Sequence, residues 1–227
     1  MSRSVLLKLR SAFRRVADPR RAPQMQAYMK SSMPYHGVPT TPMRQVCRQC
    51  FRDLEFKDAE SWRNAVLYVF RHARFREEWY AAVELSISKK MKAFRTLEAL
   101  PMYEEMIVTA AWWDVVDTLA AHGVGGILRD YPKPMKREMR AWSRSENMWK
   151  RRTAILSQLA FKKETDLKLL YDCIEPSLNS KEFFLRKAIG WALRQYAWID
   201  PGEVKRYVRE NESRLSPLSK REALKNV

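Results

Sequence analysis

The stretch Thr109-Ala110-Ala111-Trp112-Trp113-Asp114-Val115-Val116-Asp117 decides how the fold is interpreted. At about 100° per residue it predicts a helix with one apolar, core-facing side, made of Trp112, Val115, Val116 and Leu119. Trp113 and Asp117 are four residues apart, so they share a neighbouring face. No basic residue in the same turns neutralises the Asp117 carboxylate. Two interpretations stay open: Trp113 is core and Asp117 a solvated acid, or the indole and the carboxylate form a site.

Composition indicates a folded, helix-rich chain. The 227 residues are 46% hydrophobic and include eight Trp, which argues against disorder. Only six Gly are present, which disfavours glycine-rich phosphate loops. No apolar run approaches the roughly 20 residues that span a bilayer. The chain is long enough for one large domain or a repeat array.

The charge balance predicts a polyanionic partner. Lys and Arg total 43 against 26 Asp and Glu, a net charge of +17, which usually means nucleic acid; a membrane surface is the competing interpretation. Residues 1–17 predict an amphipathic basic helix that docks on the protein surface, with an organelle presequence as the alternative. Cys47, Cys50 and Cys173 make no disulfide framework. Cys47-x-x-Cys50 lacks a second ligand pair, and the histidines lack metal spacing, so we expect no metal site and no cofactor.

Nearly every segment has 3.6-residue periodicity and none alternates as a strand, which predicts an all-α fold. We expect the Gly-rich residues 122–126 to end the central helix, and Ser219-x-x-Glu222 to be a capping box for the last helix. Thr41 is the expected N-cap of the helix that follows the 33–42 loop. The main helices are expected at about 2–17, 19–29, 42–54, 59–73, 75–89, 91–98, 110–121, 134–142, 146–160, 163–175 and 180–196.

Aromatic residues recur about every 35 positions, at Trp79, Trp113, Trp149 and Phe184. A period of this length with a helix pair per unit is typical of a HEAT-like repeat α-solenoid. We expect a single curved domain over 1–227, in which the helix at 1–17 precedes helical repeats over 18–227. A basic concave surface would cradle a duplex, although a protein-binding scaffold would show the same period.

Several strings together resemble the AlkD-type DNA alkylation repair glycosylases. They are Ile107-Val108-Thr109-x-x-Trp112-Trp113-Asp114-x-Val116-Asp117, Asn147-Met148-Trp149 through Leu156, Lys187-Ala188-Ile189-Gly190-Trp191-x-Leu193-Arg194, and Pro217-Leu218-Ser219-Lys220-Arg221-Glu222-Ala223. The likeness runs from about Ala27 to the C-terminus and is weaker over 120–145.

The resemblance implies HEAT-like repeats that hold duplex DNA, and hydrolysis of the N-glycosidic bond of N3- or N7-alkylated purines, methyl or bulky, without a pocket for the base. It also implies that Asp117, Trp113 and Trp191 contact the lesion's deoxyribose. Arg152 and Arg194 match arginines that hold backbone phosphates. Neighbouring basic residues are further candidates for the DNA contact: Lys150, Arg151 and Lys187.

The chemistry of these residues suits the implied reaction. A departing alkylpurine leaves a sugar with oxocarbenium character, which a carboxylate and aromatic faces stabilise. No lysine nucleophile is evident, so we expect a monofunctional enzyme. We expect a monomer in the cytoplasm, associated with the nucleoid. The alternative is a non-catalytic HEAT-like protein that binds bent or damaged duplex. Lys133, Lys136, Arg137 and Arg140 either touch the DNA backbone or form a solvated charge run.

Overall fold

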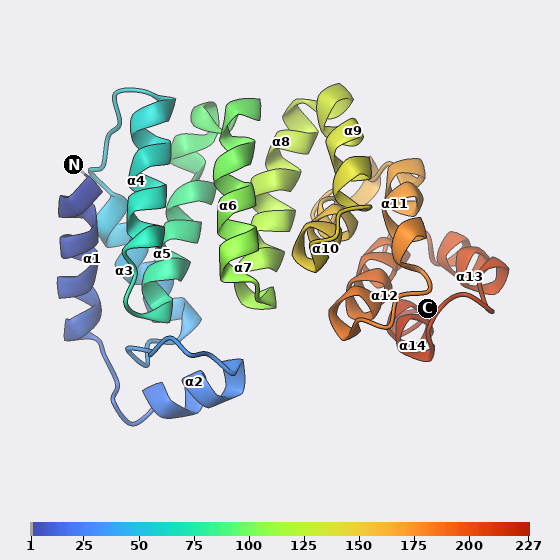
Figure 1. Cartoon of the computed structure of the whole chain (residues 1–227), viewed down its shortest axis with the longest axis horizontal. Coiled ribbons are helices and arrows are strands. Elements are labelled where there is room, and N and C mark those ends of the chain that lie inside the picture. Colours follow the sequence, from blue (N-terminus) through green and yellow to red (C-terminus); the bar gives the residue numbers. More distant parts are fainter. Residues whose placement is uncertain (1) are drawn as a thin grey trace. The chain divides into compact units, whose positions relative to one another are not determined.

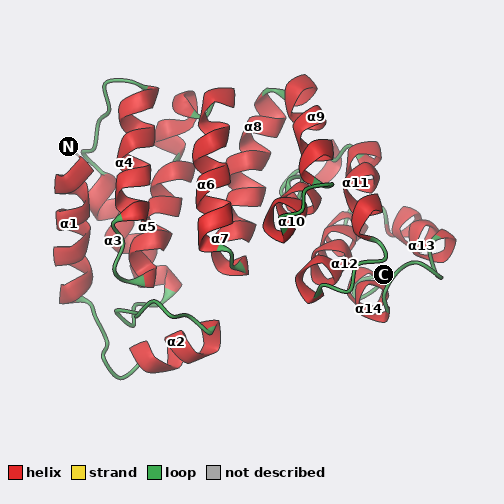
Figure 2. Ribbon diagram, viewed as in Figure 1, coloured by secondary structure: helices red, strands yellow, loops and turns green. Residues whose placement is uncertain are grey.

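The computed structural model describes residues 2–227 and contains helices joined by short loops, with no strand among those residues (Figures 1 and 2). This confirms the all-α class, and the packing of successive helices fits the HEAT-like solenoid. Met1, which belongs to the helix expected over 1–17, lies outside the described residues. The chain forms two compact units, one ending at Arg95 and the other running from Thr96 to Val227. The single domain over 1–227 therefore stays a prediction.

The first unit is built from five α-helices and one 3₁₀ segment: α1 (Ser2–Arg15), α2 (Ala22–Met29), α3 (Thr40–Phe51), α4 (Ala59–Arg71), α5 (Arg76–Ile87) and η1 (Lys89–Phe94). α1 packs on α3 and α4, and α4 and α5 form a pair joined by a short turn. Trp62 is fully buried in the core, and its indole N–H donates to the Leu85 carbonyl at 3.4 Å. The apolar face of α1 packs inside this unit, because Leu9 and Phe13 are completely buried.

A buried acid ties the loop before α3 to the start of α5. The fully buried Glu77 carboxylate accepts hydrogen bonds from the backbone N–H groups of His36 and Val38, at 2.9 and 3.0 Å. The loop was expected, but α3 begins at Thr40 with Pro39 at the N-cap, so the expected Thr41 cap is wrong. The difference is within the usual uncertainty of helix ends.

The second unit contains the remaining helices: η2 (Leu97–Ala99), α6 (Leu100–Ala110), α7 (Trp113–Thr118), η3 (Leu119–Val124), α8 (Gly125–Asp130), α9 (Pro132–Trp142), α10 (Met148–Leu156), η4 (Lys162–Glu164), α11 (Leu167–Ile174), η5 (Glu175–Ser177), α12 (Phe183–Ala197), α13 (Pro201–Glu210) and α14 (Pro217–Ala223). α10 packs against α9, α11 and α12, and α12 packs against α13 and α14.

The Gly-rich residues do not end the central helix, which corrects the expectation for 122–126. η3 is a π-helix, and it leads directly into α8. Two of the glycines are needed for packing rather than for a turn. A Cβ on Gly123 would lie 2.6 Å from the Tyr103 ring, and one on Gly125 would lie 2.3 Å from the Ser157 carbonyl oxygen. The sequence was misread because Gly usually marks a helix end.

α12 and α14 approach closely at a third glycine. A Cβ on Gly190 would lie 2.5 Å from the Glu222 Cβ and 2.8 Å from the Ser219 carbonyl oxygen. The Ser219 hydroxyl also donates to the Arg186 carbonyl of α12 at 2.9 Å. The expected Ser219–Glu222 capping box is wrong, because Ser216 caps α14 and Pro217 opens it. Glu222 is therefore available to α12.

Candidate functional site

A sharp turn places Trp113 and Asp117 on α7. Ala111 adopts the left-handed conformation (φ 43°, ψ 41°) and Trp112 is extended, so the helix begins at Trp113 instead of Ala110. Trp112 was expected on the core face of the helix and instead occupies the N-cap, half-buried. Trp113 and Asp117 are half-buried and one turn apart, as their spacing predicted.

Asp117 forms a two-pronged ion pair with Arg152 of α10. Arg152 Nε donates to Asp117 Oδ1 at 2.7 Å, and Nη2 donates to Oδ2 at 2.8 Å. The Arg152 side chain is 5% exposed and the Asp117 side chain is 13% exposed. Arg152 Nη1 also donates to the Phe184 carbonyl at the start of α12. The Asp117 carboxylate is thus neutralised by Arg152, 35 positions away, although no basic residue lies in the same helical turns. Such a forked pair fixes the orientation of both groups.

Burial and the ion pair act on the Asp117 carboxyl in opposite directions. Burial raises its pKa above the ordinary aspartate value, the Arg152 guanidinium lowers it, and the Asp114 carboxylate raises it further, with a net rise. The charged form of Asp117 therefore depends on Arg152 for its stability.

A cluster of three aromatic rings lies beside the Asp117–Arg152 ion pair. Ring centroids of Trp112 and Trp149 are 6.3 Å apart, those of Trp112 and Phe184 are 5.3 Å apart, and those of Trp149 and Phe184 are 5.1 Å apart. The Arg152 guanidinium carbon lies 5.9 Å from the centre of the Phe184 ring. Asn147 caps α10 by accepting from the N–H groups of Trp149 and Lys150, which sets the start of this helix. These contacts join the start of α7 to α10 and α12 next to the Asp117 carboxylate.

Trp191 lies on α12, seven residues after Phe184. Seven residues are nearly two turns, so both side chains project from almost the same face of the helix. Trp191 is partly buried and packs against the core of α10 to α14. This packing fits a core residue, and the contact between Trp191 and a lesion's deoxyribose stays a prediction.

The other expected DNA contacts occupy ion pairs near this region. Glu222 of α14 accepts from Arg194 Nη1 at 2.7 Å and forms an ion pair with Lys187 Nζ at 2.8 Å. The hydrogen bond with Lys187 has the largest effect on Glu222, and together with the charges of Lys187 and Arg194 it lowers the pKa of this carboxyl. Lys150 Nζ pairs with Glu104 at 2.6 Å and lies 4.9 Å from the centre of the Trp142 ring. Glu222 was missed at the sequence level because it was assigned to a cap.

Arg151, the remaining candidate, is half-buried. Its Nε atom is buried with no hydrogen-bond partner among residues 2–227. The structure thus brings Arg152 to Asp117 and gathers Arg194 and Lys187 on Glu222. The phosphate contacts assigned to these basic residues stay predictions.

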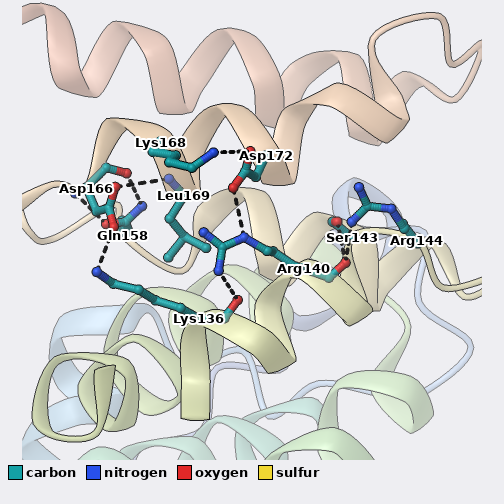
Figure 3. A network of polar contacts seen from close by, with 9 residues as sticks. All are labelled: Lys136, Arg140, Ser143, Arg144, Gln158, Asp166, Lys168, Leu169 and Asp172. Atoms are coloured by element: carbon teal, nitrogen blue, oxygen red, sulfur yellow. Dashed lines mark hydrogen bonds and ion pairs between the residues drawn. The ribbon is translucent and has the colours of Figure 1, made fainter. Parts of the chain in front are cut away.

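Half of the basic residues expected as a charge run before α10 form ion pairs with Asp166 and Asp172. Figure 3 shows Lys136 with Asp166 and Arg140 with Asp172, at 2.7 and 2.8 Å, and Lys168 also reaches Asp172 at 3.6 Å. Half of the expected charge run therefore fastens α9 to α11. Lys133 and Arg137 are exposed.

Residues 2–227 contain neither a metal-ligand cluster nor a membrane-spanning helix. No group of three or more His, Cys, Asp or Glu in that range could hold a metal ion. Its helices are all too short or too polar to cross a bilayer.

Comparisons with known proteins place this chain in a family. A family model described as DNA alkylation repair enzyme matches residues 9–227. The chain is also similar to a solved structure described as a predicted DNA alkylation repair enzyme from Enterococcus faecalis, with 29% identity and a TM-score of 0.82. That match covers 93% of this chain and 96% of the other. No match is found among curated proteins.

Proposed function

Because this chain belongs to the DNA alkylation repair enzyme family, we propose that it is a monofunctional DNA glycosylase. Its substrate is duplex DNA that carries cationic N3- or N7-alkylated purines, with methyl or bulky adducts. It acts as a monomer on nucleoid DNA in the cytoplasm. The observation that carries the proposal is the buried Asp117–Arg152 pair beside Trp113 on α7.

In the proposed reaction the C1′–N9 bond breaks and its electron pair leaves with the base. The alkylated base was a cation and departs neutral, so it needs no general acid. Positive charge moves onto the sugar, where the Asp117 carboxylate stabilises it and orients a water molecule. The water oxygen bonds to C1′ and releases a proton to solvent, which leaves an abasic site.

Asp117 suits this role because its charge is fixed in a poorly solvated place. A carboxylate that is already oriented needs no reorganisation as the sugar becomes cationic, so its attraction increases toward the transition state. The indoles of Trp113 and Trp191 add cation–π attraction of about 0.5–2 kcal/mol each. Arg152 keeps the carboxylate ionised and oriented. In this proposal Arg194 and Lys187 bind a backbone phosphate of the DNA.

The test is release of free N7-methylguanine from methylated duplex DNA, measured by mass spectrometry. We expect Asp117→Asn to lower the single-turnover rate by about 10²–10³-fold, the effect of losing one preorganised electrostatic group. Asp114→Asn is the matched control, since Asp114 lies on the same helix and caps its first turn through the Val115 N–H. Its rate should stay within a few-fold of wild type.

Three results would contradict the proposal. The first is that wild type releases no modified base from methylated or bulky-adduct DNA; if it nevertheless binds that DNA, the chain is the non-catalytic duplex-binding protein. The second is that Asp117→Asn reacts as fast as Asp114→Asn. Strand cleavage without alkali would contradict the monofunctional assignment, because a monofunctional enzyme leaves the abasic site intact.

A further inference from the structure

An open cavity of about 500 Å³ in the first unit is surrounded by arginines. Arg3 and Arg10 reach it from α1, and Arg71 and Arg74 reach it from the end of α4 and the turn that follows. No acidic residue lines it. Four guanidinium groups around one cavity repel one another, so the cavity is arranged to attract an anion.

Arg10 is held in place by Glu78, which does not line the cavity, and by the His72 carbonyl. Its Nε and Nη2 atoms donate to the Glu78 carboxylate at 3.0 and 3.1 Å, and Nη2 also donates to the His72 carbonyl at 2.6 Å. The Glu78 side chain is 1% exposed, so this acid compensates Arg10 from behind and is inaccessible to a ligand. Arg10 is thus a fixed donor at the wall.

Two of the other cavity cations lack an acidic partner in the described part of the chain. Arg3 and Arg74 are exposed and form no ion pair within the part of the chain that the structure describes. Beside them the rings of Tyr68 and His72 stack, with centroids 4.0 Å apart and planes 21° apart, and His72 Nδ1 lies 2.9 Å from the Tyr68 carbonyl. The cavity therefore combines two exposed arginines, one arginine held by hydrogen bonds and a stacked pair of aromatic rings.

We propose that this cavity binds a phosphate group. The planar fork of a guanidinium matches two oxygens of one phosphate, and several forks can surround a tetrahedral anion. The phosphate belongs either to the backbone of a nucleic acid or to a free phosphorylated compound, and both would present the same oxygens. The site lies outside the Asp117 region, and the inference does not rest on the proposed glycosylase activity.

The experiment uses the full chain and the double variant Arg3→Gln/Arg74→Gln. The matched control is Arg20→Gln/Arg48→Gln, which removes two exposed arginines of the same unit that lie off the cavity and make no ion pair within residues 2–227. All four sites are exposed, so the variants should melt like wild type. Pyrophosphate binding is measured by calorimetry at constant ionic strength. Affinity for unmodified duplex DNA is measured by fluorescence anisotropy over a range of salt concentrations.

We expect the cavity variant to bind pyrophosphate at least about tenfold more weakly, while the control binds like wild type. If the phosphate comes from DNA, the cavity variant also loses about 0.9 from the slope of log affinity against log salt, the effect of one lost phosphate contact. If DNA binding is unchanged while pyrophosphate binding falls, the ligand is a free phosphate compound. The proposal is overturned if wild type does not bind pyrophosphate, or if both variants lose the same affinity.

Discussion

Replacing Arg152 by Met would leave a buried charge without its partner. Met retains much of the side-chain volume, but the Asp117 carboxylate, 13% exposed, would lose the guanidinium that compensates its burial and would still be repelled by Asp114. Removing one member of a buried ion pair costs about 3–5 kcal/mol. For a chain of this size each kcal/mol lowers Tm by roughly 2–4 °C, so Arg152→Met should melt about 6–20 °C below wild type.

The loss should depend on pH in a defined direction. Burial raises the pKa of Asp117, and removing Arg152 deletes the main influence that lowers it. A carboxyl whose folded pKa exceeds its unfolded pKa destabilises the fold when ionised, so the penalty is complete once the pH exceeds the folded pKa. It shrinks as pH falls through the folded pKa, because the protonated acid has no charge to bury. The Tm gap between wild type and Arg152→Met should therefore narrow on acidification.

Neutralising the acid should rescue the variant. Asp117→Asn/Arg152→Met has no buried charge, so it should be more stable than Arg152→Met alone, although the Phe184 carbonyl still lacks its donor. Arg151→Met is the matched control, and we expect a change below about 1 kcal/mol because Arg151 makes no such pair. Thermal unfolding followed by circular dichroism measures all four proteins. The reasoning is refuted if the double variant is no more stable than Arg152→Met, or if the Tm gap does not vary with pH.

Three further predictions concern the second unit. Gly190→Ala should cost about 1–3 kcal/mol, because its Cβ would lie 2.5 Å from Glu222 and 2.8 Å from a backbone oxygen; an unchanged Tm would show that α14 moves freely. Asp166→Ala should cost about 1 kcal/mol by removing the cap of α11, and equal denaturation midpoints would exclude that. Lys187 and Arg194 hold the pKa of Glu222 below its usual range, so Glu222 contributes stability that is complete above the ordinary glutamate pKa. Wild type should therefore exceed Glu222→Gln in Tm at neutral pH, and the excess should vanish at strongly acidic pH.

Local periodicity was sufficient to place Trp113 and Asp117 together, because residues four apart on a helix must share a face. It could not show that the helix starts at Trp113, since the positive φ of Ala111 has no glycine to announce it. It also assigned the glycines at 123 and 125 to a helix end, although their hydrogen atoms make room for Tyr103 and Ser157.

Helical periodicity could not identify Arg152 as the partner of Asp117, but the repeat of about 35 residues could. Arg152 follows Asp117 by 35 residues, the same spacing that separates the recurring aromatics. Arg129 and Glu164 are also 35 apart, and Arg140 and Asp172 are 32 apart. Complementary charges one period apart were therefore the available signal. Glu222 carried the same signal, since it lies 35 residues after Lys187, but it was assigned to a cap.

The π-turn at Leu119–Val124 has a consequence for how this protein tolerates change in length. A π-helix accommodates one residue more per turn than an α-helix, so deleting a single residue there would let the backbone close into a regular α-helix without breaking the chain's continuity. The segments on either side would keep nearly the same orientation about the helix axis, because the residue removed is the one that the wider turn accommodates. The carboxylate on α7 would therefore stay beside the Arg152 guanidinium. A single deletion inside a regular α-helix instead rotates its two parts by about 100° relative to each other, so this segment is where the second unit can lose a helical residue and keep its site.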